Sequence, residues 1–262
     1  MVKISEIEQF MCETHPLKLA ESWDNVGLLL GRRDRHVTKL MTCLTVSLDV
    51  VAEAKAKGVE LILSHHPFPF KAANKFTDGS TEGRLLLDLL ESKIAVFSSH
   101  TAFDSVRDGI NAMTLKGLGL DSSAPLIPKD DLPGGTGRMS ACDWTWEDAL
   151  RRIQTFYDLK NFWGVKCGER FRKVGIVCGS GGDFISTAKS KGVDLFITGE
   201  ATFHQCVLAR HLGVTLVLTG HFKSERFAME QLADKLQAQF SSLSVFPSVV
   251  ECDPLMLLGE IV

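Results

Sequence analysis

Short aliphatic runs alternate with helical patterns along most of this 262-residue chain. The runs are rich in β-branched and large apolar residues, and the segments between them have the spacing of helices about ten to fifteen residues long. For example, "LMTCLTVS" (40–47) is followed by the helical pattern "LDVVAEAKAKG", which Gly58 closes. Further strands are expected at 59–64, 94–99, 171–179, 193–199 and 214–220. This alternation predicts an α/β fold with largely parallel sheets.

The two parts of the chain also resemble each other. "KGVELILSHH" (57–66) aligns with "KGVDLFITGE" (191–200), and "IAVFSSHTAFD" (94–104) aligns with "VTLVLTGHFKSE" (214–225). Any two βα units share such features, so the likeness alone leaves coincidence open. The segment 121–140, with three prolines and three glycines, is typical of a loop between domains. We therefore expect two related α/β halves, 1–125 and 126–262, whose strand ends face one pocket.

Composition excludes several classes of protein. The formal charge of −3 and the scattered Lys and Arg residues argue against a nucleic-acid partner. Seven widely spaced cysteines without a CxxC pair argue against a disulfide framework and against a structural zinc knot. No segment has the length and apolar character of a signal core or a membrane span. These features predict a cytoplasmic protein.

Histidines and carboxylates follow the predicted strands at their carboxyl ends. His65 and His66 come directly after one strand, and His-x-x-x-acid pairs follow two others. The pairs are His100 with Asp104 and His221 with Glu225, while Glu200 and His204 follow the preceding strand of the second half. Open α/β sheets bind ligands at this edge. Imidazoles and carboxylates together are ligands of zinc, manganese, iron or nickel, so the pattern predicts a metal site.

Other interpretations of these residues carry weight too. Each His-x-x-x-acid pair, taken alone, is typical of a helix cap or a surface pair. The glycine-rich "CGSGGDF" (178–184) could hold an anion with its amides, although it lacks a dinucleotide fingerprint and a Walker lysine. A Ser-His-Asp hydrolase is poorly supported, because the chain has no G-x-S-x-G elbow. The metal hypothesis thus depends on the whole cluster.

Several motifs together resemble one known family. "SWDNVGLLLG" (22–31), "SHHPFPF" (64–70), "SSHTAFDSVRDGIN" (98–111), "VCGSGGDFI" (177–185), "DLFITGE" (194–200) and "LTGHFKSER" (218–226) occur in order over nearly the whole chain. The chain resembles the Nif-three-like dinuclear metal-binding proteins, also called type 2 GTP cyclohydrolase I homologues. It is similar to their short form, without an inserted domain between the halves.

The resemblance implies particular roles for these residues. It implies two divalent metal ions, with Asp104 or Glu225 bridging, and this set of ligands: His65, His66, Asp104, His221 and Glu225. It also implies that His100 and His204 line the site, where they are candidates for proton transfer in catalysis. Ala102, Phe103, Phe203, Phe222 and Lys223 depart from the family pattern, so contacts with the substrate are expected to differ. The resemblance further implies a homohexamer.

Two functions fit this interpretation. The first is a dinuclear metal-dependent hydrolase of a nucleotide or related small substrate, with a metal-activated water as nucleophile. The second is a non-enzymatic metal-binding interaction protein or metal chaperone. Spare proton-transfer groups beside the ligands, namely His100, His204 and Glu200, favour the enzyme.

Overall fold

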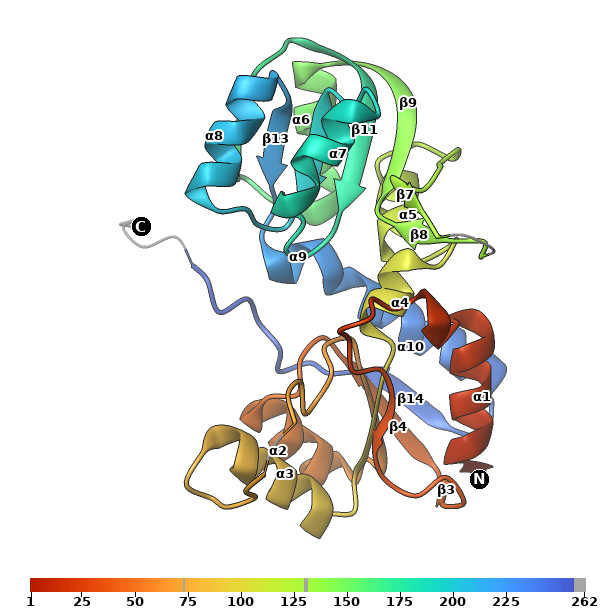
Figure 1. The fold of residues 1–262 in the computed structure, drawn as a ribbon. Coiled ribbons are helices and arrows are strands. Elements are labelled where there is room, and N and C mark those ends of the chain that lie inside the picture. Colours follow the sequence, from red (N-terminus) through yellow and green to blue (C-terminus); the bar gives the residue numbers. More distant parts are fainter. Residues whose placement is uncertain (73, 130–131, 257–262) are drawn as a thin grey trace.

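Two five-stranded sheets form the two lobes of the molecule, as Figure 1 shows for this computed structural model. The structure describes residues 1–72, 74–129 and 132–256. Each sheet contains consecutive parallel strands, with one antiparallel edge strand in the first sheet and two in the second. The predicted α/β class with largely parallel sheets is confirmed.

The first sheet has the order β14-β4-β5-β6-β2. Its strands are β2 (Gly27–Leu30), β4 (Lys39–Cys43), β5 (Leu61–Ser64), β6 (Ala95–Ser98) and β14 (Ser244–Pro247). β14, β4, β5 and β6 are parallel, and β2 pairs antiparallel with β6. β5 and β6 are buried at every position, which explains why their sequences are continuous apolar runs and do not alternate.

The second sheet has the order β10-β13-β12-β11-β9. Its strands are β9 (Arg138–Thr145), β10 (Trp163–Val165), β11 (Arg170–Val177), β12 (Leu195–Thr198) and β13 (Thr215–Leu218). β11, β12 and β13 are parallel, and the edge strands β9 and β10 are antiparallel. Two short pairs lie outside these sheets: β1 (Val2–Lys3) with β3 (His36–Val37), and β7 (Ile127–Pro128) with β8 (Gly135–Thr136).

Helices cover both faces of each sheet. On the first sheet, α1 (Ile4–Thr14) and α10 (Phe227–Gln239) share one apolar core, and α2 (Leu48–Lys57) and α3 (Thr81–Glu91) share the other. On the second sheet, α5 (Ile110–Gly117) and α6 (Trp146–Tyr157) pack on one face, with α7 (Ile185–Ser190) and α8 (Phe203–Leu212) on the other. Each sheet is therefore the middle layer of a three-layer unit.

Four shorter helical segments complete the fold. These are η1 (Leu17–Leu19), α4 (His100–Ser105), η2 (Gly182–Phe184) and α9 (His221–Glu225). The pattern "DSVRDGINAMTLKGLG" (104–119) is typical of one helix, but the structure contains α4 and α5, separated at 106–109. Gly109 allows this break, because a Cβ there would lie 1.8 Å from the carbonyl oxygen of Phe103.

The last strand belongs to the first sheet. β14 comes from the end of the chain but pairs with β4, and α10 packs on the same first sheet. Residues from the predicted second half, 126–262, thus complete the first sheet. The division of the chain into two domains at 125/126 stays a prediction. Among the described residues, no helix combines the length and the apolar character needed to cross a membrane.

Candidate metal centre

The carboxyl ends of strands from both sheets bring the predicted residues together. His65 and His66 follow β5, and His100 begins α4 just after β6. From the other lobe, His221 begins α9 after β13, and Glu225 ends that helix. Figure 1 shows α9 where the two lobes meet. The arrangement follows the rule that ligand sites of open α/β sheets lie at this edge.

One triad combines His66, His221 and Glu225. The two Nε2 atoms are 3.3 Å apart, and they lie 3.1 Å and 3.2 Å from Glu225 Oε2. Ligand atoms bound at roughly 2.0–2.2 Å to a tetrahedral ion are themselves about 3.4 Å apart. The three atoms therefore have the spacing of ligands around one ion.

A second triad combines His65, Asp104 and Glu225. His65 Nε2 lies 3.6 Å from Asp104 Oδ1 and 3.7 Å from Glu225 Oε1. Both ring nitrogens of His65 are buried without a hydrogen-bond partner among the described residues. A buried nitrogen without a partner is costly, and a metal ion between His65 and the carboxylates would satisfy one of these nitrogens.

These groups could hold a metal ion. Ligand atoms lie within 4.8 Å of one another in each of three sets: His65, His66 and His100; His66, His221 and Glu225; His65, Asp104 and Glu225. His65 and Glu225 are almost fully buried. The structure thus brings together all five predicted ligands and His100, while their role as ligands stays a prediction.

Charge interactions within the cluster are strong. The hydrogen bond that His221 donates to Glu225 raises the pKa of that imidazole to about 9. Burial alone would lower the pKa of His65, but Asp104 and Glu225 raise it overall. Burial would raise the pKa of Glu225, but the surrounding histidines, with His65 first, hold it well below its usual range. An anionic carboxylate among imidazoles is the electrostatic arrangement that a divalent cation would complete.

Three imidazoles are oriented through their Nδ1 atoms. His66 Nδ1 lies 2.8 Å from Thr45 Oγ1, His100 Nδ1 lies 2.8 Å from Asp24 Oδ1, and His221 Nδ1 lies 3.0 Å from Glu200 Oε1. Such partners fix the ring and aim its Nε2 at the metal position. Glu200, a candidate for proton transfer in the sequence, therefore contacts the ring of His221.

His100 occupies an unusual backbone conformation at the start of α4. Its φ is +26°, a left-handed value that non-glycine residues seldom adopt. Asp24 accepts hydrogen bonds from the backbone N–H and hydroxyl of Thr101 as well as contacting His100. These bonds hold the pKa of Asp24 below its ordinary value, against the opposing effect of burial. Strained backbone of this kind is common at functional sites.

His204 does not join the cluster. It is exposed on α8 and contacts the ring of Phe203, with centroids 5.6 Å apart. It is absent from the metal-capable groups found among the described residues. No contact in the described chain supports its catalytic role, which remains a prediction.

The glycine-rich loop packs against the cluster. Its amides at Cys178, Gly179 and Gly181 already donate to Asn111, Ser224 and Thr198, so they cannot also hold an anion. A Cβ on Gly179 would lie 2.3 Å from Glu225 Oε1, and its φ is +61°. Glycine is therefore required at this position, because its backbone lies too close to Glu225 for any larger residue.

Sequence reasoning missed several supporting residues. Asp24 and Thr45 hold imidazoles, and the Sγ of Cys178 lies 3.2 Å from Asp104 Oδ1. Asn111 donates to the carbonyl oxygen of Asp104 at 3.1 Å. The only signal for Asp24 was its place in the "SWDNVG" motif, because no sequence spacing links it to His100.

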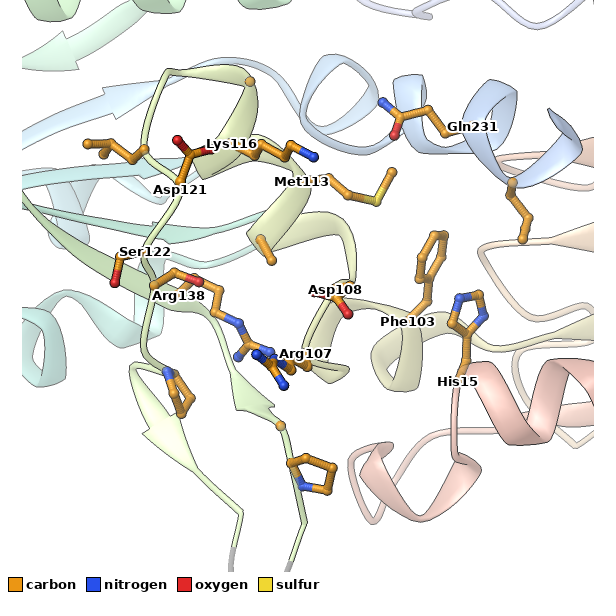
Figure 2. Close-up of a pocket in the computed structure, with 18 of the residues that line it drawn as sticks. His15, Phe103, Arg107, Asp108, Met113, Lys116, Asp121, Ser122, Arg138 and Gln231 are labelled. Carbon is orange, nitrogen blue, oxygen red and sulfur yellow. The ribbon is translucent and has the colours of Figure 1, made fainter. Parts of the chain in front are cut away.

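A separate cavity of 1220 Å³ lies between α5, α10 and the β7–β8 pair. Figure 2 shows Arg107, Lys116 and Arg138 around it, with His15 and Phe103 at one side. Phe103 stacks on His15 at 4.1 Å between ring centroids and lies 6.4 Å from the ring of His65. No presumed ligand lines this cavity, so it is distinct from the metal centre.

Comparison with known proteins identifies the family. The model of the family described as Duf34/NIF3 (NGG1p interacting factor 3) matches residues 2–254. The chain belongs to the DUF34/NIF3 family. A Clostridium perfringens relative named "GTP cyclohydrolase 1 type 2 homolog" is 32% identical over 92% of this chain and 94% of its own length. The Drosophila melanogaster "NIF3-like protein 1" is 31% identical over 98% of this chain and 88% of its own length.

Solved structures agree with this NIF3 assignment. The Staphylococcus aureus protein SA1388 superposes with a TM-score of 0.87 at 26% identity, over 98% of this chain and 99% of its own. Reduced HcgD from Methanocaldococcus jannaschii superposes with a TM-score of 0.83 at 28% identity, over 94% of this chain and 97% of its own. The family predicted from the motifs is therefore confirmed.

Proposed function

We propose that this NIF3-family chain is a hydrolase that uses two divalent metal ions to act on a nucleotide or a related small substrate. The observation that carries the proposal is the position of Glu225. Its Oε1 faces His65 at 3.7 Å, and its Oε2 faces His66 and His221 at 3.1 Å and 3.2 Å. Each carboxylate oxygen thus serves a different triad, which supports two ions with Glu225 as the bridge.

The donor set supports first-row ions. Three imidazoles and two carboxylates suit zinc, manganese, iron or nickel, and they do not select one of these. Divalent ions held there would polarise a substrate oxygen and ease the ionisation of a water molecule.

The chain's own residues then have distinct tasks. Asp24 holds one nitrogen of His100, so that ring keeps a fixed orientation beside His65 and His66. An imidazole in this position could accept or donate a proton during hydrolysis. Glu200 holds the ring of His221 in the same way from the exposed side of the cluster. This oriented imidazole beside the metal centre favours an enzyme over a metal store.

The nucleotide substrate is supported by the relatives. Several of them carry the name GTP cyclohydrolase 1 type 2 homolog, and the Helicobacter pylori relatives carry the name GTP cyclohydrolase 1 type 2. The substrate is also limited by access, because the side chain of His65 is fully buried while those of His66 and His221 are 24% and 35% exposed. A substrate would therefore approach from the His66 and His221 side.

We also propose a homo-oligomer, with the hexamer of the family resemblance as the expected form. Trp163 and Phe203 are each 76% exposed. Phe203 lines a groove of 380 Å³ between β10 and α8, and Trp163 is next in sequence to Gly164, which also lines it. Exposed aromatic rings gathered at one place are typical of an interface. Light scattering that finds only a monomer of 28.8 kDa would overturn the oligomer.

Metal analysis combined with an activity screen tests the function. We expect about two divalent ions per chain, and release of product from GTP or another nucleotide that stops when a chelator removes the ions. One ion per chain would contradict the bridge at Glu225. Two tightly held ions with no turnover of any nucleotide or phosphoester would instead favour the metal chaperone.

A further inference from the structure

Two exposed aromatic side chains stand beside the metal centre. Trp23 is 63% exposed and Phe70 is 51% exposed. Their ring centroids are 6.3 Å apart, with planes inclined by 54°. Exposed aromatic rings gathered at one place are a common mark of a binding surface.

Hydrogen bonds hold the two loops that carry these rings. Asn25 Nδ2 donates to the carbonyl oxygen of Pro69 at 2.8 Å, which ties the residues after Trp23 to the residue before Phe70. Asp24, next to Trp23, is fixed by His100 and Thr101. The backbone N–H of Glu21 also donates to the Thr101 hydroxyl at 2.9 Å. The backbone beneath both rings is therefore built in advance, which reduces the entropy cost of binding.

His100 lies between these two rings and the candidate metal ligands. The ring of His100 lies 6.0 Å from that of Trp23 and 6.3 Å from that of Phe70, measured between centroids. On its inner side, His100 lies 5.2 Å from His65 and 5.6 Å from His66. A molecule that stacks on Trp23 or Phe70 therefore has its near edge about one ring away from the presumed ligands.

We propose that Trp23 and Phe70 form a stacking platform for a planar heteroaromatic ring of the substrate. The inference rests on the proposed function and deepens it, because it names the part of the substrate that the chain recognises. Aromatic side chains bind the π-face of a base without hydrogen bonds, so the platform selects for a conjugated ring and tolerates different bases. The polar part of the same substrate would extend past His100 to the metal centre.

If the platform exists, ligands with a heteroaromatic base should depend on it, and ligands without such a base should not. Guanosine, which has a base but no phosphate, is the probe for stacking, and ribose 5-phosphate is the matched ligand without a heteroaromatic base. Loss of one stacking side chain should weaken guanosine binding roughly tenfold to a hundredfold. Ribose 5-phosphate binding should be unchanged.

The experiment uses the intact, metal-loaded protein with Trp163 changed to Phe, since Trp163 is 76% exposed on β10 and would add its own fluorescence response. In this background we expect guanosine, and not ribose 5-phosphate, to quench tryptophan fluorescence to saturation. Calorimetry should find weaker guanosine binding in Trp23→Leu and in Phe70→Leu, and wild-type binding in Trp163→Phe alone. Because both platform residues are exposed, these variants should melt at the wild-type temperature.

Three results would overturn the platform. Guanosine could bind Trp23→Leu and Phe70→Leu as tightly as wild type. Ribose 5-phosphate could quench as well as guanosine. Light scattering could show that Trp23→Leu dissociates with guanosine binding intact, which would make the pair an interface between copies.

Failure of the platform differs from failure of the proposed function. Guanosine binding that depends on Trp23, without metal-dependent turnover of any nucleotide, would remove the hydrolase and retain the platform. If phosphoesters without a heteroaromatic base were hydrolysed as fast as nucleotides in a metal-dependent way, the hydrolase proposal would stand and the platform would be rejected.

Discussion

His66 and His221 come from different sheets, yet their Nε2 atoms lie 3.3 Å apart. Each follows a parallel strand of its own lobe, β5 for His66 and β13 for His221. Glu225, one helical turn after His221, lies within reach of both. The candidate metal centre thus combines residues from both lobes, so its geometry depends on the packing between them.

Changing Glu225 to Gln should remove metal from both triads. The side chain keeps its size but loses the charge that faces His65, His66 and His221. Loss of a partner that merely orients a ligand costs about 10–100-fold in affinity, so loss of the bridge should cost at least that much. Metal content after dialysis, measured by mass spectrometry, gives the result.

His211→Gln is the control for that change. His211 lies in the last turn of α8, exposed and away from the cluster. It should retain wild-type metal content. Equal loss in both variants would mean that general destabilisation, and not ligation, explains the effect.

Gly179→Ala should displace Glu225. A Cβ at this position would lie 2.3 Å from Glu225 Oε1, and the φ of +61° adds strain for an alanine. Gly213 offers a matched control, because its φ is +66° but nothing lies within 4 Å of a Cβ there. Both alanine variants should lose about 1–2 kcal/mol of stability through the backbone. Only Gly179→Ala should also bind metal more weakly in calorimetric titration, and similar metal affinity in the two variants would contradict the close approach.

His15 should make the protein sensitive to acid. Burial lowers the pKa of His15 from 6.5 to about 3, so the folded chain holds this ring neutral. The unfolded chain takes up a proton as the pH falls below 6.5. The contribution of His15 to the free energy of unfolding is therefore fully present above pH 6.5. It falls by up to about 1.4 kcal/mol per pH unit between pH 6.5 and pH 3.

The His15→Phe variant isolates that effect. Phenylalanine preserves the stack on Phe103 and cannot be protonated. Urea unfolding of the metal-free proteins should show that the free energy of unfolding falls between pH 7 and pH 5. The fall should be larger for wild type than for the variant, by up to about 2 kcal/mol. Equal losses in the two proteins would mean that His15 titrates normally in the folded chain.

The parallel strands and the residues that follow them could be predicted from the sequence. Buried strands such as β5 and β6 are continuous apolar runs, and this signal is local. His65 and His221 could be found because they immediately follow such runs. The strand β2 was missed because it is a short antiparallel edge, where the apolar run is weak evidence.

Other parts of the site depend on contacts that sequence spacing does not encode. Asp24 and His100 are 76 residues apart, and Thr45 and His66 are 21 residues apart. The pairing of β14 with β4 is also a contact between segments far apart in sequence, which no local pattern indicates. His204 shows the reverse, because its place after a strand suggested the cluster while α8 directs it to the exposed face beside Phe203.

Asp24→Asn should slow turnover while metal content stays close to that of wild type. Asp24 contacts His100 at 2.8 Å and also accepts from Thr101. The amide keeps the size of the side chain but removes the negative charge that faces His100 Nδ1 and accepts from Thr101. Removal of such an orienting carboxylate costs about 10–100-fold in activity. We expect kcat on a nucleotide to fall by that factor with KM little changed. Glu21→Gln is the matched control, because Glu21 lies on the same loop and its side chain contacts Thr136 and Lys129, away from the metal centre. A parallel loss of bound metal in Asp24→Asn would mean that Asp24 supports the ligands themselves, and an unchanged kcat would exclude His100 from proton transfer.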